Sequence, residues 1–359
     1  MKQTMRAAVV EAPHKMVLKE VPVPRITDDE VLVQVSYCGI CGSDWSIYTG
    51  KYAAEKLPLI TGHEMFGTIA EVGKNARGLR TGDRVAVDIC LPCGTCYFCR
   101  KGDGLLCETF AQLGIHMNGG FAEYVKAPWK NIYPIPDGLD DYTATFVEPL
   151  TAVLQACRRL DAEIAASCAV IGCGLGVLHA KVALLRGCTP VIVLGDSERR
   201  LKIARDMGVD HTINIKEVAD PVAEVKRLTH GRGADYVIEA VGTSRTYEQA
   251  FAMLRRGGKL EAFGICAGDD YARLPPYEFV LGEKKVSGSC AGIGNDWGDA
   301  IQLLSHKRID PMPLLTMAVP LEELESALQE IRQNPNIFKV FVSPRIDRRI
   351  VMDPSCKGV

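Results

Sequence analysis

The chain has 359 residues, of which 47% are hydrophobic and 24% charged, a balance typical of globular proteins of about two domains. Its 42 Lys and Arg residues nearly balance 44 Asp and Glu residues, which argues against the basic surface of a nucleic-acid-binding protein. No apolar run approaches the roughly 20 residues that span a bilayer, and the first residues lack a signal-peptide pattern. We therefore expect a cytoplasmic protein with neither a nucleic-acid nor a membrane partner.

The first 140 residues are rich in Gly and Pro and carry short runs with β-strand character. Turn signals separate these runs, which predicts a compact β-rich domain over residues 1–150. The runs are EVLVQVSY (30–37), GTIAEV (67–72), DRVAVDI (83–89) and FAEYVKA (121–127).

The pattern changes near residue 143, and the apolar side chains at helical spacing over residues 142–160 predict a helix there. Strands and helices then alternate, which predicts a second domain at 151–288 with a parallel sheet and right-handed crossovers. Its expected helices are 177–187, 197–208 and 245–258. Two amphipathic helices and a strand at 289–345 are too short for a domain, and we expect them to return to the first one. The polar residues 346–359, with Cys356, are expected to form a loosely held tail.

Cysteines gather at residues 90–107, where five of them occur within eighteen positions. In a reducing compartment such cysteines are thiols or metal ligands rather than disulfides. The spacing C-x2-C-x2-C-x7-C offers four thiolates for a closed tetrahedral zinc shell, as in structural sites. The predicted ligands are Cys93, Cys96, Cys99 and Cys107. Cys90 is expected to pack against the sheet, although a register that uses Cys90, Cys93, Cys96 and Cys99 stays open.

A catalytic zinc ion needs an open coordination position, hence fewer and more mixed protein ligands. Cys41 in YCGICGSDW, and His63 beside Glu64, supply a thiolate, an imidazole and a carboxylate. Glu148 lies in an apolar segment, where a carboxylate is costly to bury unless it meets a cation. From the residues alone, Cys38 and Cys41 could instead be a redox pair, and the His-Glu pair could be an ordinary surface feature.

The segment GHEMFGTIAEVGKNA, residues 62–76, resembles the zinc signature G-H-E-x2-G-x5-G of the medium-chain alcohol dehydrogenase family. The stretches CGSD, GDRV and NGGFAEYV follow the family's order, and the resemblance covers residues 5–343. CGSD together with FVEPLTAVLQACRR is most similar to the polyol (sorbitol-type) branch, with threonine dehydrogenases nearby. The resemblance implies an α/β fold, with a Rossmann doubly wound parallel sheet domain and a β-rich GroES-like catalytic domain. It also implies a homodimer or homotetramer.

Position by position, the resemblance implies that Cys41 and His63 bind a catalytic zinc ion. Glu64 and Glu148 compete for the remaining protein position, or one of them acts through water. Together with the cysteine cluster, this implies two zinc ions per subunit.

The resemblance also gives roles to the residues after Cys41. Ser43 matches the hydroxyl that touches the substrate oxygen and starts a proton relay. Asp44 matches the carboxylate that orients the ligating imidazole. Both could instead only cap a helix. Trp45 and Tyr48 are candidates for the lining of the pocket, or for the core.

The segment VIGCGLGVLHAKVALLRG, residues 170–187, follows a strand and opens a helix, which is the context of a dinucleotide fingerprint. Its glycines are spaced G-x-G-x-G, one residue shorter than the usual G-x-G-x-x-G. Asp196 ends the next strand, where a carboxylate binds the ribose hydroxyls and favours NAD over NADP. Arg199 and Arg200 soften that preference, and Asp196 could instead cap the following helix.

By resemblance, the strand ends at 239–242 and 262–265 hold the nicotinamide half of the cofactor. The expected cofactor-binding residues are Gly172, Gly174, Leu175, Gly176, Asp196, Arg200, Val241 and Gly264.

The predicted reaction is hydride transfer from a polyol or a related secondary alcohol to NAD+, in a cleft between the domains. The segment VSGSCAGIGNDW, residues 286–297, lacks the Arg and the aromatic residue that polyol dehydrogenases tend to have there. A threonine-type or sugar-acid substrate therefore stays open. A scaffold that binds a dinucleotide without catalysis is the non-enzyme alternative, motivated by the short glycine turn.

Overall fold

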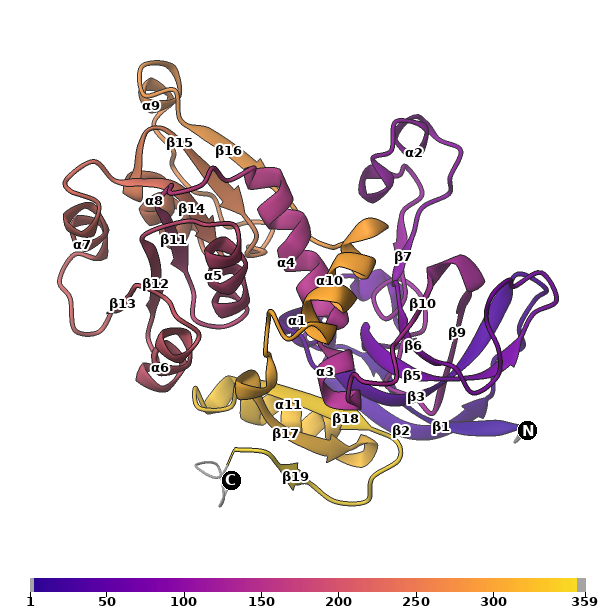
Figure 1. Ribbon diagram of the computed structural model, residues 1–359. Coiled ribbons are helices and arrows are strands. Elements are labelled where there is room, and N and C mark those ends of the chain that lie inside the picture. Colours follow the sequence, from indigo (N-terminus) through magenta and orange to yellow (C-terminus); the bar gives the residue numbers. More distant parts are fainter. Residues whose placement is uncertain (1–2, 354–359) are drawn as a thin grey trace. The chain divides into compact units, whose positions relative to one another are not determined.

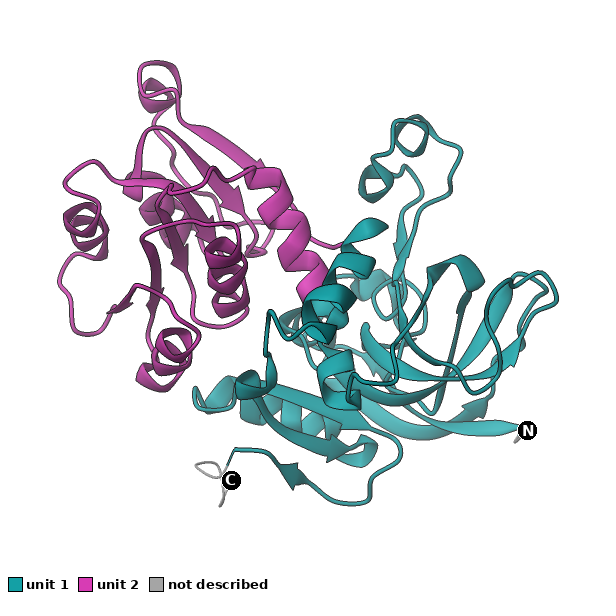
Figure 2. Ribbon diagram, viewed as in Figure 1, with its two compact units in different colours: residues 1–149, 293–359 teal, residues 150–292 magenta. Residues whose placement is uncertain are grey.

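The computed structural model describes residues 3–353, which form two compact units (Figures 1 and 2). Unit 1 comprises residues 1–149 and 293–359, and unit 2 comprises residues 150–292. Cys356 and the end of the expected tail lie outside the described residues. No helix in the described part of the chain is both long enough and apolar enough to cross a membrane.

Unit 1 is built on a large sheet whose strands come from both of its chain segments. Its strands lie in the order β10-β6-β5-β3-β18-β17-β19, and β9 also pairs with β3. They are β3 (Glu30–Gly39), β5 (Glu64–Val72), β6 (Arg84–Val87), β9 (Tyr124–Pro128), β10 (Ile132–Pro134), β17 (Leu315–Pro320), β18 (Lys339–Ser343) and β19 (Ile350–Val351). Because β18 pairs with β3, the end of the chain completes a sheet that its beginning started.

Smaller elements surround this sheet. A second sheet has the order β2-β1-β4, and a ribbon of β7 and β8 leads to the cysteine lobe. These strands are β1 (Thr4–Ala12), β2 (Lys15–Pro22), β4 (Leu59–Ile60), β7 (Cys90–Leu91) and β8 (Ala111–Gln112). The helices are α1 (Gly42–Tyr48), α2 (Tyr97–Arg100), α3 (Asp141–Thr145), α10 (Asn295–Ser305) and α11 (Leu324–Gln333). Single 3-10 turns lie at η1 (Ala54–Lys56), η2 (Gly104–Leu106), η3 (Trp129–Asn131), η4 (Met312–Leu314) and η5 (Leu321–Glu323).

Two expectations for unit 1 are wrong. The single helix expected at 142–160 is two helices, α3 and α4 (Val147–Leu160). Pro149 has no N–H to donate to the carbonyl of Thr145, so the helical hydrogen-bond ladder is broken between them.

The expected loose tail is instead ordered through residue 353. There β19 pairs with β17, and Arg349 donates to both carboxylate oxygens of Glu330, at 2.8 and 2.6 Å, and also to Glu323. The charge and hydrogen bonds of the guanidinium fasten a segment that has no apolar periodicity of its own.

Unit 2 contains one parallel six-stranded sheet in the order β13-β12-β11-β14-β15-β16. Figure 1 shows α5 and α6 on one face of this sheet and α7 and α8 on the other. The strands are β11 (Cys168–Ile171), β12 (Val191–Gly195), β13 (His211–Asn214), β14 (Ala234–Glu239), β15 (Leu254–Ala262) and β16 (Lys285–Gly288). The helices are α5 (Gly176–Leu185), α6 (Glu198–Asp206), α7 (Pro221–Leu228), α8 (Ser244–Met253) and α9 (Pro276–Val280).

This strand order is that of a Rossmann sheet, in which ligands bind at the carboxyl ends of the strands. Between the two layers of helices the sheet buries aliphatic side chains such as Ile192, Leu194 and Val237. One expected helix is too long, because α8 ends at Met253 and residues 254–258 begin β15. Leu254 leaves the helix in an extended conformation and pairs with Ala234, so strand pairing overrides the helical pattern there.

Candidate active site and metal centres

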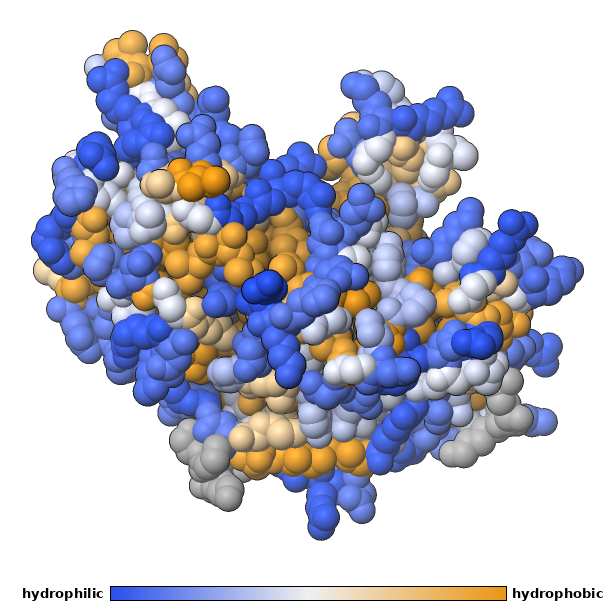
Figure 3. Space-filling view, in the orientation of Figure 1, coloured by the Kyte–Doolittle hydropathy of each residue, from blue (hydrophilic) through white to orange (hydrophobic). Residues whose placement is uncertain are grey.

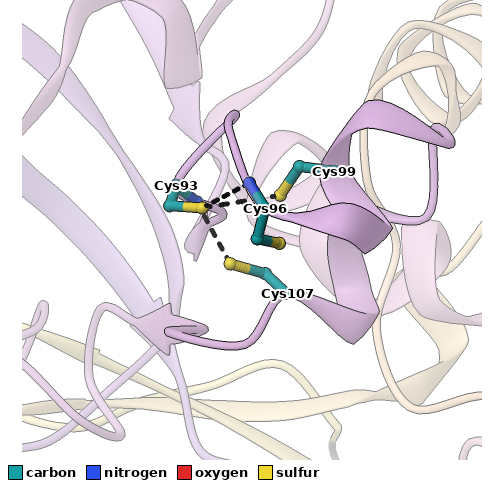
Figure 4. Close-up of side chains that lie close together, drawn as sticks. All are labelled: Cys93, Cys96, Cys99 and Cys107. Atoms are coloured by element: carbon teal, nitrogen blue, oxygen red, sulfur yellow. Dashed lines mark hydrogen bonds between the residues drawn. The ribbon is translucent and has the colours of Figure 1, made fainter.

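Four cysteine thiols meet in the lobe at residues 93–107 (Figure 4). The sulfur atoms of Cys93, Cys96, Cys99 and Cys107 all lie within 4.8 Å of one another. Four sulfurs held about 2.3 Å from one tetrahedral ion would be about 3.8 Å apart, and the sulfurs of Cys93 and Cys99 are 4.0 Å apart. The donor set therefore fits a zinc ion with no open position.

The backbone of the lobe prepares two of these sulfurs, those of Cys93 and Cys107, for a metal. The amides of Thr95 and Cys96 donate to Cys93 Sγ, at 3.4 and 3.3 Å, and the amide of Cys93 donates to Cys107 Sγ at 3.2 Å. The hydrogen bonds from Thr95 lower the pKa of the Cys93 thiol to about 5, which favours the thiolate that metals bind. Cys90 is buried on β7 against Gln112 and does not belong to this group, so the alternative register is not the one that the fold assembles.

A second donor group of unit 1 combines three kinds of ligand. One ligand atom each from Cys41, His63 and Glu64 lie within 4.8 Å of one another. His63 Nδ1 is buried without a hydrogen-bond partner among the described residues. A thiolate, an imidazole with an unused buried nitrogen and a carboxylate suit a zinc ion that keeps a position open.

Asp44 holds the two segments of this group together. Its carboxylate accepts from the amide of Cys41 at 2.8 Å and from the amide of Gly62 at 3.1 Å. Its Oδ1 is also 3.6 Å from His63 Nδ1, too far for a hydrogen bond but close enough for attraction between charges. Burial opposes a charge on His63, yet Asp44 outweighs it and raises the pKa of the imidazole. Asp44 therefore caps the first turn of α1. It also stabilises a positive charge on the imidazole of His63, whether that charge comes from a proton or from a bound metal ion.

Glu64 has a cationic partner that the sequence did not reveal. Lys339 Nζ lies 2.5 Å from each carboxylate oxygen of Glu64 and donates to the carbonyl of Ile40 at 3.0 Å. Burial alone would lower the pKa of this amine, but Glu64 and Cys41 raise it above its usual value. The carboxylate lies directly over Gly39, where a Cβ atom would be only 1.9 Å from Glu64 Oε2. Gly39 is therefore needed for the position of Glu64.

Glu148 lies close enough to the donor group to share its electrostatics. Burial raises the pKa of Glu148 to about 8, with His63 and Lys339 opposing this rise and Glu64 adding to it. It is not among the residues whose ligand atoms lie within 4.8 Å of one another. In this structure Glu64 is thus the carboxylate beside the thiol and the imidazole.

The other candidates near Cys41 divide between the site and the core. Ser43 Oγ lies 3.3 Å from His63 Nε2, beside the donor group. Tyr48 is buried and donates from its hydroxyl to Glu325 at 2.6 Å, so it belongs to the core. Trp45 is half-buried, and the guanidinium of Arg332 lies 5.7 Å from its ring centroid. Cys38 is fully buried and burial raises the pKa of its thiol, which disfavours the thiolate that a redox pair would need.

In unit 2, the glycine turn stands at the carboxyl end of β11. Gly172 has φ +112°, and its amide donates to the carbonyl of Leu194 at 2.9 Å. A Cβ atom on Gly174 would meet nothing within 4 Å, so the turn is open to a ligand there. Leu175 caps α5 and Gly176 begins it, where a helix N-terminus attracts phosphate. The shortened spacing still forms a strand, a tight turn and a helix.

Asp196 follows β12 with its side chain exposed. The N-cap of α6 is Ser197, so capping does not explain Asp196. Lys216 Nζ donates to the main-chain oxygen of Asp196 at 2.7 Å and lies 3.9 Å from its carboxylate. Sequence reasoning named Arg199 and Arg200 as nearby cations and missed Lys216, which comes from beyond the next strand.

The two units define a zinc-type dehydrogenase, and comparison with known proteins agrees. Residues 27–137 match the alcohol dehydrogenase GroES-like domain, and residues 174–306 match the zinc-binding dehydrogenase domain. The chain is 33% identical to D-arabinitol dehydrogenase 1 of Uromyces fabae over 95% of this chain and 97% of that protein. It is 35% identical to L-threonine 3-dehydrogenase of Bacillus subtilis over 91% of this chain and 95% of that protein.

Solved structures agree as well. An alcohol dehydrogenase from E. coli CFT073, complexed with NADH, has a TM-score of 0.88 at 28% identity and covers 95% of this chain and 100% of its own. Galactitol-1-phosphate dehydrogenase from Escherichia coli has a TM-score of 0.86 at 28% identity, with the same coverage. The chain therefore belongs to the zinc-binding alcohol dehydrogenase family, and the predicted family and fold class are confirmed. It is an enzyme that oxidises alcohols.

Proposed function

We propose that this enzyme oxidises a polyol or a related secondary alcohol with NAD+, using one zinc ion at Cys41, His63 and Glu64. The observation that carries the proposal is the donor group itself, three different ligand types within 4.8 Å beside Ser43. When bound, zinc would polarise the substrate hydroxyl and lower its pKa, and NAD+ would accept the hydride. Ser43 Oγ would accept the hydroxyl proton while passing its own proton on toward solvent, because it is the hydroxyl beside this group.

The charges around the donor group favour an uncharged substrate. A sugar acid or an amino acid brings a carboxylate, which needs a cation to offset its burial. Lys339, the cation beside the donor group, is already held by Glu64 and Ile40. Arabinitol and sorbitol dehydrogenases are among the similar proteins, which also supports a polyol. A threonine dehydrogenase is similar too, so a 3-hydroxy amino acid is the second candidate.

The test is a cofactor-reduction screen over C3 to C6 polyols, sugar acids and threonine, with and without a chelator. We expect polyols to be oxidised and the chelator to abolish the reaction. Turnover of threonine or a sugar acid alone would overturn the polyol proposal. Turnover that survives complete removal of zinc would overturn the metal assignment.

The assigned ligands are tested by Cys41→Ser, with Cys38→Ser as the matched control three residues earlier. Cys41→Ser should lose turnover and keep its fold. Cys38→Ser should keep turnover per folded molecule, because Cys38 is fully buried and not part of the donor group. Equal loss in both variants would favour a redox pair instead. Metal analysis should give two zinc ions per subunit, the second at the cysteine lobe.

We also propose NAD as the preferred cofactor, because Asp196 would repel the 2′-phosphate of NADP. Lys216, 3.9 Å from that carboxylate, reduces the repulsion, so the preference should be moderate. The ratio of kcat/KM for NAD+ and NADP+ measures it, and Asp196→Ala should bring the ratio toward one. A wild-type preference for NADP+ would contradict the assignment.

We also propose that the enzyme forms a homo-oligomer. Hydrophobic side chains gather on the surface over α9 (Figure 3), where Val280 and Leu281 are 73% and 52% exposed. The edge strand β16 also exposes Val286. Exposed apolar groups beside an open sheet edge are typical of protein interfaces. Light scattering should show a dimer or tetramer, and a monomer at micromolar concentration would refute this.

A further inference from the structure

Glu239, the last residue of β14, is a fully buried carboxylate that no step above uses. Its side chain turns back onto the loop that follows the strand. Oε1 accepts from the amides of Val241 and Gly242, at 2.9 and 3.0 Å, and Oε2 lies 3.1 Å from the amide of Gly242. These partly buried amides have left the ladder of β14, and the carboxylate supplies acceptors for them.

The same residue also fixes the loop that follows β15. The main-chain oxygen of Glu239 accepts from the amides of Phe263 and Gly264, at 3.0 and 2.8 Å. A Cβ atom on Gly264 would be 2.5 Å from Glu239 Oε2 and 2.3 Å from the amide of Gly242, so the two loops touch over this carboxylate. The hydroxyl of Tyr247 donates to the carbonyl of Gly264 at 2.6 Å and closes the arrangement.

Both loops stand at the carboxyl edge of the sheet, beside the glycine turn. A Cβ atom on Gly172 would meet Val241 Cγ2 at 3.0 Å, so the turn and the first loop are packed together. Two apolar side chains nevertheless remain exposed on these loops, Val241 at 49% and Ile265 at 70%. Apolar side chains exposed on hydrogen-bonded loops beside a glycine turn suit the flat faces of a dinucleotide.

We propose that Glu239 is a positioning residue for the dinucleotide, holding the loops after β14 and β15 in the conformation that receives it. The inference rests on the proposed cofactor site. Glu239 does not touch the cofactor; it acts through the backbone of Val241, Gly242 and Gly264. A neutral amide cannot replace it fully, because one of its two heavy atoms would be a donor facing the amide of Gly242. The loops should then relax and bind the dinucleotide less tightly.

The test compares Glu239→Gln with Glu261→Gln in the full-length, zinc-loaded enzyme. Glu261 is an equally buried carboxylate on the neighbouring strand, but it accepts from the side chains of Ser287 and Ser289 rather than from the loop amides. NADH affinity is measured by fluorescence titration well below the melting temperature, beside melting curves without cofactor. We expect about a tenfold weaker NADH affinity for Glu239→Gln and an affinity within twofold of wild type for Glu261→Gln. In steady state, the KM for NAD+ should rise more than kcat falls.

A third variant separates failure of this inference from failure of the site. Gly174→Val should fold, because the space at Gly174 is open, and should block the dinucleotide. If Gly174→Val weakens NADH binding and Glu239→Gln leaves it unchanged, the positioning role is refuted while the site stands. If neither variant changes NADH affinity, the cofactor site itself is misplaced. Equal weakening in Glu239→Gln and Glu261→Gln would mean general destabilisation and would also refute the role.

Discussion

We expect the buried imidazole of His179 to make the stability of this enzyme sensitive to mild acid. Its imidazole is fully buried in α5, 4.4 Å from Phe263 between ring centroids, and neither ring nitrogen finds a hydrogen-bond partner among the described residues. Burial lowers the pKa of this imidazole from 6.5 to about 3. At a pH between these two pKa values, the imidazole is protonated in the unfolded chain and neutral in the folded chain. The free energy of unfolding must therefore fall as the pH falls below 6.5.

The size of the effect follows from the difference between the pH and the pKa of the imidazole in the unfolded chain. At pH 5 the unfolded imidazole is about 1.5 pH units below its pKa, and each unit is worth about 1.4 kcal/mol, which gives about 2 kcal/mol. Urea unfolding at pH 7.5 and 5.0 measures the loss in wild type and in His179→Leu. The variant should lose about 2 kcal/mol less than wild type over this range. His211→Gln, which removes an exposed imidazole, should lose as much as wild type.

Other groups titrate over the same range, but they are common to all three proteins and cancel in the difference. An equal loss in wild type and His179→Leu would show that the buried imidazole either takes up a proton in the folded state or meets water. Either result would refute the reasoning.

Three further predictions concern particular contacts. Gly39→Ala should cut activity at least tenfold with the fold retained, because its Cβ would displace the Glu64 carboxylate. Gly42→Ala, whose Cβ would meet nothing within 4 Å, should keep an activity near that of wild type. Equal activities of the two variants would show that Glu64 can move freely. Cys96→Ser should lose one zinc ion per subunit and lower Tm by more than about 5 °C, whereas Cys90→Ser should keep both ions. Metal analysis and calorimetry measure the two effects. A Cys96→Ser protein that holds two zinc ions would contradict the assignment of the lobe. Arg349→Ala should cost about 1–2 kcal/mol of unfolding free energy in urea titration, because two carboxylates lose their cation; no change would mean that the segment 346–353 adds no stability.

The parts of the site that sequence predicted are those encoded by local spacing or by a family signature. Cys93, Cys96 and Cys99 lie within seven residues, so a short loop brings them together. The resemblance singled out the pair His63 and Glu64, and Glu64 begins β5, which contains the run predicted at 67–72.

The parts that sequence missed depend on contacts between distant segments. Lys339 reaches Glu64 across 275 positions, and no local pattern marks it as anything but the first residue of a buried strand. The role of Gly39 appears only once β3 and β5 are in register, with Gly39 opposite Glu64. The two misjudged helices have different causes. The helix at 142–160 is interrupted locally at Pro149, whereas the helix at 245–258 lost its last residues to pairing with a neighbouring strand.

The interrupted chain path of unit 1 has a consequence for synthesis. Strand β3 leaves the ribosome early, but its neighbour β18 is made only after all of residues 150–292. Lys339 follows Gly39 by 300 positions, so at roughly 5–20 residues per second that edge of β3 waits tens of seconds for its partner. During this interval a growing chain displays an open hydrogen-bonding edge to every other nascent copy on the same messenger. Slowing translation within residues 150–292 should therefore raise the aggregated fraction, even though the finished protein would be identical.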